Sequence, residues 1–226
     1  MAGESARRRG ESARARAERL IAQAERREKG ARGEARTARV LEGLGPGFHA
    51  LHDLAWPGRD RANIDHVVIG PTGVFVIDTK NWAGRVEVRD DVLRQNGYER
   101  ELTSGGAAAS AIGALVPDHS AAVFPVICLV LDEPMRATTQ GVWICSTENV
   151  VDLIRSRPTV FDADRVAMLT HRIADATTGH LDRPAVQRSR PATRSRGRAL
   201  AGVLTAACVF VSVPLVGTAI ESLASP

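Results

Sequence analysis

The sequence contains little cysteine and few aromatic residues. Its 226 residues include three cysteines, and aromatic residues make up 4% of the chain. Cys128, Cys145 and Cys208 show no Cys-x-x-Cys spacing, so neither a zinc site nor a disulfide framework is predicted. All three stand in apolar segments and are expected to be small buried side chains in a reducing compartment. The low aromatic content offers no stacking platform from which a preference for single-stranded nucleic acid could be argued.

The first 32 residues also lack an apolar run, so we expect no N-terminal signal peptide. They carry ten Lys/Arg and five Glu, a net charge of +5, within a seven-residue repeat whose units begin with Glu. This composition favours a helix, either a solvated charged helix or an arm that touches nucleic acid or anionic lipid. Residues 33–182 are acidic by contrast, with fourteen Lys/Arg and twenty Asp/Glu. Bulk charge therefore gives no argument that the folded part binds nucleic acid.

Residues 199–220 form a run of 22 residues without one charge. As a helix they would be about 33 Å long, enough to cross the hydrocarbon core of a bilayer. Five arginines precede the run between Arg188 and Arg198, so the positive-inside rule predicts a single-pass cell-membrane protein with its domain in the cytoplasm. Residues 181–198 would be an Arg-rich linker that also contacts anionic lipid headgroups. The alternative is that 199–220 is a buried helix of a soluble fold.

Between the arms, residues 33–180 predict one mixed α/β domain. The apolar run at 123–131 is typical of a central strand, and Gly45-Pro46 would end the first helix. We expect helices at 34–44, 104–116, 147–156 and 163–176, and strands at 50–54, 64–69, 74–80, 85–89, 92–95, 123–131 and 142–145.

Two of these strands form a predicted hairpin that brings acidic residues together. A turn centred between residues 71 and 72 pairs Ile69 with Val74 and, further along, Asp65 with Asp78. Opposed Cβ atoms lie about 4.5–5.5 Å apart, and two carboxylates there repel by about 3 kcal/mol at an effective dielectric of about 20. Such a buried pair needs a shared proton or a cation. Lys80 projects from the same face as Asp78, so the three residues predict metal-assisted hydrolysis.

Three segments carry a family resemblance. They are Gly33-Glu34 at the head of a helix, Ile64-Asp65-His66 on a strand, and residues 70–84, which read GPTGVFVIDTKNWAG. Together they resemble the nuclease-related domain family, NERD, of the PD-(D/E)XK or restriction-endonuclease-like superfamily, over roughly residues 30–150. The resemblance implies an α/β fold with a restriction-endonuclease-like mixed β-sheet flanked by helices. The charged N-terminal helix and the C-terminal transmembrane helix would be additions to that fold.

The resemblance also implies roles for four residues. Asp65 would be the metal-binding aspartate and Asp78 the second acidic ligand, at a position where the family more often has Glu. Lys80 would steady the attacking water or the charge of the transition state, and Glu34 would add an accessory carboxylate. The metal would be Mg²⁺ (or Mn²⁺), which prefers carboxylates and water, and the reaction would be phosphodiester hydrolysis in DNA or RNA.

Plainer interpretations stand beside these roles. Asp65 and Asp78 could be exposed strand-end residues if a bulge shifts the register. Lys80 could only neutralise Asp78, and Glu34 could only complement the helix dipole. Family members often carry a glutamine motif on the helix after these strands, whereas residues 103–110 of this chain contain no glutamine.

The histidines and the tryptophan near the motif are expected to be structural. His66 alternates away from Asp65 and is expected to be packed or hydrogen-bonded. His49 and His52 lie three residues apart on a predicted strand, so they should point to opposite faces. Trp82 follows the motif and should pack, with stacking on a base or ribose as the alternative.

Three functions remain open on the sequence. The first is a membrane-anchored, metal-dependent nuclease that hydrolyses phosphodiester bonds at the cytoplasmic face. The second is a non-catalytic nucleic-acid-binding or scaffold module that keeps the nuclease fold and is tethered to the membrane. The third is a membrane-associated interaction protein whose basic arms contact anionic lipid. The oligomeric state is left open.

Overall fold

A computed structural model describes residues 3–59 and 62–178 of the chain. Its elements, in chain order, are α1 (Glu4–Leu41), the 3-10 helix η1 (Glu42–Leu44), β1 (His49–Ala55), β2 (Asn63–Gly70), β3 (Gly73–Lys80), β4 (Val86–Arg89), β5 (Val92–Gln95), β6 (Tyr98–Glu99), α2 (Thr103–Leu115), the 3-10 helix η2 (Pro117–Ala122), β7 (Val123–Leu129), β8 (Arg136–Thr139), β9 (Val142–Ser146), α3 (Val150–Arg155) and α4 (Ala163–Thr177).

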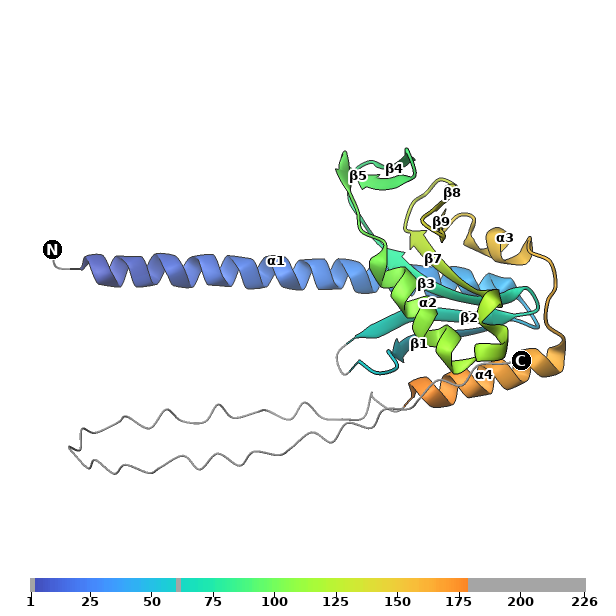
Figure 1. The fold of residues 1–226 in the computed structure, drawn as a ribbon. Helices are drawn as coiled ribbons and strands as arrows, with labels where there is room; N and C mark the ends of the chain where they lie inside the picture. The colour runs from blue at the N-terminus through green and yellow to red at the C-terminus, as the bar shows by residue number, and fades with distance from the viewer. Residues whose placement is uncertain (1–2, 60–61, 179–226) are drawn as a thin grey trace, which may run out of the picture. The chain divides into compact units, whose positions relative to one another are not determined.

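The main sheet has six strands in the order β1-β2-β3-β7-β9-β8 (Figure 1). β1, β2 and β3 are antiparallel, β3, β7 and β9 run parallel, and β8 returns antiparallel at the edge. β4, β5 and β6 form a second, three-stranded sheet inserted between β3 and α2. The predicted mixed sheet is therefore confirmed, with β7 in the central position expected from its apolar sequence.

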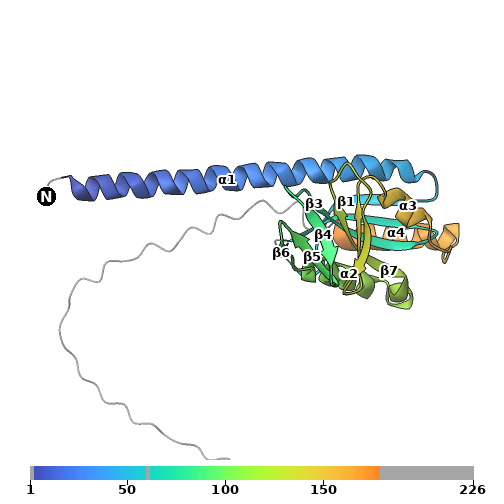
Figure 2. The ribbon, with the colours of Figure 1, turned by 90° about the horizontal axis from the view of Figure 1, so that it is seen from above.

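Helices cover both faces of the main sheet (Figure 2). α2 and α4 pack on one face, where Val67 and Val76 meet Ile112 and Leu169. On the other face, α1 and α3 bury a second core that includes Leu41, Phe75, Cys128, Cys145 and Ile154. Cys128 and Cys145 are thus the small buried side chains that were predicted. Cys208 lies outside the described residues.

The charged N-terminal helix and the first helix of the domain are one element. The sequence predicts them separately, but α1 contains no proline and continues through Gly30 and Gly33. Gly33 is its first buried residue, where a Cβ would lie 2.7 Å from the Asn81 Cβ. Glycine thus lets α1 approach the end of β3 closely. The helix gives way to η1 just before Gly45, near the predicted end.

Several boundaries differ from the sequence prediction. β8 and the two-residue β6 are not predicted, and β7 ends at Leu129 rather than at 131. α3 begins at Val150, with Asn149 as its N-terminal flanking residue, rather than at 147. Asp162 caps α4, with its Oδ1 accepting a hydrogen bond from the Arg165 backbone N–H at 2.8 Å.

No helix within 3–59 and 62–178 is long and apolar enough to cross a membrane. The predicted transmembrane helix at 199–220 and the predicted linker at 181–198 lie outside the described residues.

Candidate active site

The candidate site forms where strands β2 and β3 separate. Their ladder follows the predicted register from Gly70–Gly73 through Val67–Val76, but its last pair is His66–Ile77. Beyond that pair, the Oδ2 atom of Asp65 accepts a hydrogen bond from the Thr79 backbone N–H at 2.7 Å. A carboxylate thus takes the place that a strand carbonyl would occupy in a regular ladder.

A distortion of β1 lies at the same level of the sheet. Asp53 adopts a positive φ of 50° and accepts a hydrogen bond from the Asn63 side chain at 2.7 Å. On either side of it, Leu51 and Leu54 pack into the same core although they are three residues apart. Strict alternation of side chains between the two faces therefore fails in β1 at this level. Asp65 and Asp78 do not form a regular cross-strand pair.

Asp65, Asp78 and Lys80 nevertheless share one pocket of about 250 Å³. The Nζ atom of Lys80 lies 2.6 Å from Oδ1 of Asp78, and the side chains are 29% and 19% exposed. The Ser104 hydroxyl, at the start of α2, donates to Oδ2 of Asp78 at 3.2 Å. Asp78 is therefore a partly buried carboxylate whose two oxygens both accept hydrogen bonds, and not an exposed strand-end residue. The remaining lining residues are Trp56, Asn63, Ile64, Val76, Ile77, Ser104 and Ala108.

Burial raises the pKa of Asp65 to about 7. The negative charges of Asp78 and Glu34 raise the pKa further, whereas the Thr79 N–H and the charge of Lys80 lower it. Close to neutral pH, the carboxyl is therefore only partly ionised. A bound cation would favour the ionised form of Asp65. Positive charge would therefore stabilise the two carboxylates, Asp65 and Asp78, in this pocket.

Glu34 lies on α1, half-buried, and near enough to act on the Asp65 carboxyl. It does not line the pocket. In the part of the chain that the structure describes, no group of three or more His, Cys, Asp or Glu side chains is placed to hold a metal ion. Mg²⁺ usually keeps several waters and binds proteins through one or two carboxylates, so Asp65 and Asp78 suffice as a donor set for it.

The neighbouring His66 is structural, as expected. It is 2% exposed, and its Nδ1 atom lies 2.8 Å from Nδ1 of His52. Burial, and then the charge of His52, lower the pKa of His66 to about 4, so the ring is neutral near pH 7. It does not line the pocket with Asp65.

Trp82 also packs rather than faces the pocket. Its ring contacts the core beside the small sheet, and the Arg100 guanidinium carbon lies 5.5 Å from its centroid. The packing interpretation of Trp82 is the one that this geometry favours.

Sequence reasoning did not identify three residues near the site. Ser104 falls in the segment without glutamine, where a hydroxyl group bonds to Asp78. Trp56 is buried in the pocket lining, and the Arg59 guanidinium carbon lies 4.3 Å from the centroid of its ring. An aromatic residue next to Pro57-Gly58 was the available signal, but only the tertiary structure brings Trp56 to Asp65.

A larger hollow of about 510 Å³ lies between α2 and the start of β7. Among described residues, its lining consists of small and uncharged side chains such as Ser110 and Pro125. Of these two pockets, it is the smaller one at Asp65 that is lined by ionisable side chains.

Comparisons with known proteins match the segment of the chain that carries this pocket. The family model for the nuclease-related domain, NERD, matches residues 29–130, which contain Glu34, Asp65, Asp78 and Lys80. An uncharacterized protein of Bacillus anthracis is 42% identical over 59 residues, which are 25% of this chain and 28% of that protein. No solved structure matches the chain. An assignment to the PD-(D/E)XK-like superfamily is consistent with this family match. Residues 29–130 of this chain are therefore similar to the nuclease-related domain family.

Proposed function

We propose that this chain is a metal-dependent nuclease that hydrolyses phosphodiester bonds in DNA or RNA. One observation carries the proposal: Asp65, Asp78 and Lys80 line the same pocket at the point where β2 and β3 separate. The pKa of Asp65 near 7 adds a physical reason for a cation there.

Asp65 and Asp78 would hold Mg²⁺ (or Mn²⁺), with Glu34 as an accessory carboxylate. Oδ2 of Asp65 is oriented by the Thr79 N–H, whereas Oδ1 accepts no hydrogen bond from any described residue and can serve as a ligand. When bound, the metal would lower the pKa of a coordinated water and neutralise charge on the phosphate.

Lys80 and Ser104 would position the reacting groups. The Lys80 ammonium group is partly exposed in the pocket, so it could hold the attacking water or a phosphate oxygen while it pairs with Asp78. The Ser104 hydroxyl fixes the second oxygen of Asp78 and would have to release it if that oxygen binds the metal. Glutamine motifs occupy this helix in many family members, and Ser104 would supply the polar group here.

The membrane attachment is part of the same proposal. The uncharged run at 199–220 would anchor the chain, and the arginines at 188–198 would keep the domain on the cytoplasmic side and contact anionic lipid. The nuclease would then act on nucleic acid at the inner surface of the cell membrane.

A second candidate is a non-catalytic nucleic-acid-binding or scaffold module on the same fold. It is favoured by the contacts of Asp78, because both of its oxygens already accept hydrogen bonds and fewer ligand positions remain for a metal. Such a module would bind nucleic acid without cutting it.

Cleavage by the full chain, purified in detergent, separates the two candidates. Single- and double-stranded DNA and RNA are incubated with Mg²⁺ or Mn²⁺ and with EDTA, and products are resolved on denaturing gels. Lys80→Ala and Asp78→Ala should each reduce cleavage by at least about a hundredfold, because each removes a charge that acts on the transition state. Lys29→Ala, which removes the other lysine of the chain from α1, is the matched control and should cleave normally. Metal-independent binding without any cleavage would favour the scaffold module instead.

A further inference from the structure

The first 25 residues of α1 project beyond the domain as a single exposed helix (Figure 1). An α-helix turns about 100° per residue, so its charges can be sorted by side. On that basis six arginines occupy an arc of about 100° that contains no acidic residue before Glu34. We name this arc the arginine face; it consists of Arg8, Arg9, Arg16, Arg19, Arg26 and Arg27.

The acidic residues that precede Glu34 lie on other sides of the same helix. Glu4, Glu11, Glu18 and Glu25 recur every seven residues and stay within an arc of about 60°. In the described part of the chain, Arg8 is the one member of the arginine face that forms an ion pair, with Glu4 at 2.6 Å. The other five make no ion pair with any described residue, and their positive charge is directed outward into solvent.

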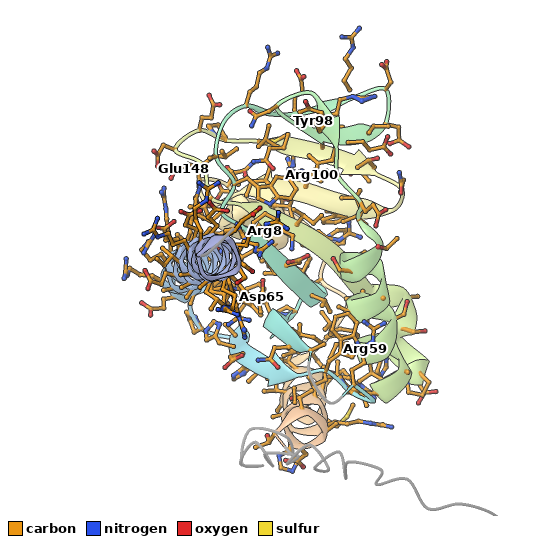
Figure 3. The ribbon with its side chains drawn as sticks, turned by 90° about the vertical axis from the view of Figure 1, so that its left-hand side faces the viewer. Arg8, Arg59, Asp65, Tyr98, Arg100 and Glu148 are labelled. Atoms are coloured by element: carbon orange, nitrogen blue, oxygen red, sulfur yellow. The ribbon has the colours of Figure 1, made fainter. Side chains whose placement is uncertain are left out.

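The arginine face is on the side of α1 that packs on the domain. Residues eighteen positions apart lie about five full turns apart and share one side of a helix. Arg19 therefore has the direction of the buried Thr37, and Arg16 has the direction of Glu34, which acts on Asp65. Figure 3 looks along α1 from its N-terminal end, and Arg8 and Asp65 both lie on the side of the helix that faces the sheet.

We propose that the arginine face is a docking surface for the phosphate backbone of a nucleic-acid duplex, which it holds in line with the pocket at Asp65. This inference rests on the proposed nuclease function and names how that site would recognise its substrate. At a rise of about 1.5 Å per residue, the face extends from about 10 Å to about 39 Å beyond Glu34 along the helix. At about 3.4 Å per base pair, that reach corresponds to about 12 base pairs on one side of the cut.

The residues around the arginine face favour a duplex over other polyanions and partners. A lipid-bound amphipathic helix needs a bulky apolar face, but the exposed part of α1 offers mainly alanine beside Leu20 and Ile21. The same alanine-rich seam is thin for a coiled coil between two copies. Single-strand binding proteins add aromatic side chains for base stacking, and the helix has none. What remains is a straight row of guanidinium groups, which suits a continuous backbone.

Binding in EDTA tests the docking surface independently of cleavage. The probe is a fluorescein-labelled duplex of about 24 base pairs, twice the reach of the helix, in a DNA and an RNA form, and the readout is anisotropy of the full chain across a salt series. The test variant is Arg16→Gln/Arg19→Gln/Arg26→Gln. The matched control, Arg7→Gln/Arg14→Gln/Arg32→Gln, removes the same charge from the opposite side of the same helix.

The test variant should weaken duplex binding at least about tenfold and reduce the slope of log K against log salt by about 2 to 3, because each lost phosphate contact contributes about 0.9. The control should change the slope by less than about 1. Glutamine keeps the helix propensity of arginine, so circular dichroism of both variants should match wild type.

Equal losses in both triple variants, or no loss in either, would overturn the docking surface. So would a test variant that loses binding to vesicles containing phosphatidylserine but keeps duplex binding, or one whose mass by light scattering shows a lost dimer. Loss of Mg²⁺-dependent cleavage in Lys80→Ala with duplex binding intact concerns the nuclease alone, so the two proposals can fail separately.

Discussion

Replacing Asp65 with asparagine is expected to change how the stability of the domain depends on pH. The pKa of Asp65 is raised to about 7 in the folded chain, chiefly by burial. In the unfolded chain the same carboxyl titrates near pH 3.9. Between about pH 4 and pH 7 the folded state therefore binds a proton that the unfolded state has lost, and stability falls as the pH rises. Between about pH 4 and pH 7, the free energy of unfolding falls by about 4 kcal/mol through this one carboxyl.

His66 acts in the opposite direction across almost the same window. Its pKa is lowered to about 4, whereas the unfolded histidine titrates near 6.5. Here the unfolded state binds the extra proton, so stability rises with pH by about 3 kcal/mol between about pH 4 and pH 6.5. The two effects nearly cancel in the wild-type chain, which should show a rather flat profile.

Urea unfolding of the full chain in EDTA, from pH 4.5 to pH 8, measures each effect. Asp65→Asn keeps a side-chain oxygen for the Thr79 N–H, so its stability should rise steeply with pH and exceed wild type by roughly 2–4 kcal/mol at pH 8. His66→Asn should show the reverse slope. Asp53→Asn, on the exposed edge of β1, removes one acidic charge and serves as the control. A profile of Asp65→Asn that runs parallel to wild type would refute the buried, proton-binding carboxyl.

Three further predictions follow from the same contacts. Mg²⁺ at a hundred times its dissociation constant should stabilise the wild-type chain by about 3 kcal/mol and leave the stability of Asp65→Asn unchanged. Calorimetric melting measures both, and an equal rise in melting temperature in the two proteins would argue against metal at this carboxylate. Gly33→Ala should cost about 1–3 kcal/mol in urea because its Cβ would lie 2.7 Å from the Asn81 Cβ, just after β3. Gly30→Ala, whose nearest neighbour is at 3.9 Å, should gain up to about 1 kcal/mol; matching effects would contradict the close approach. Asp162→Ala should lose about 1 kcal/mol with its N-cap bond, and no loss in urea would contradict the cap.

The sequence was sufficient for the hairpin that carries the site. A short turn and two apolar strands fix the pairing of Ile69 with Val74, because slipping by one residue would turn every buried side chain to the other face. The candidate pair Asp65 and Asp78 followed from the same count. Asp65, Asp78 and Lys80 do line one pocket, although the ladder ends before the expected pair of Asp65 with Asp78.

Other parts of the site depend on contacts that no local pattern reports. The end of the ladder at His66 accompanies the left-handed conformation of Asp53 on a neighbouring strand. The bond from Ser104 to Asp78 joins segments 26 residues apart, and its helix has a weak sequence signal because it is rich in glycine and alanine. β8 was missed since its four residues gain their strand conformation by pairing with β9 at the edge of the sheet.

The unbroken path of α1 has a consequence for how this part of the chain can change in length. The helix runs without interruption from the arm into the core. Adding or removing residues before Gly33 therefore rotates, about the helix axis, the part of the arm that precedes the change. A deletion of seven or eleven residues would turn the arginines by only about 20° and shorten their reach, whereas a deletion of two would turn them by about 160° toward the far side. Arms that keep these arginines toward the domain can therefore vary in length only in certain steps.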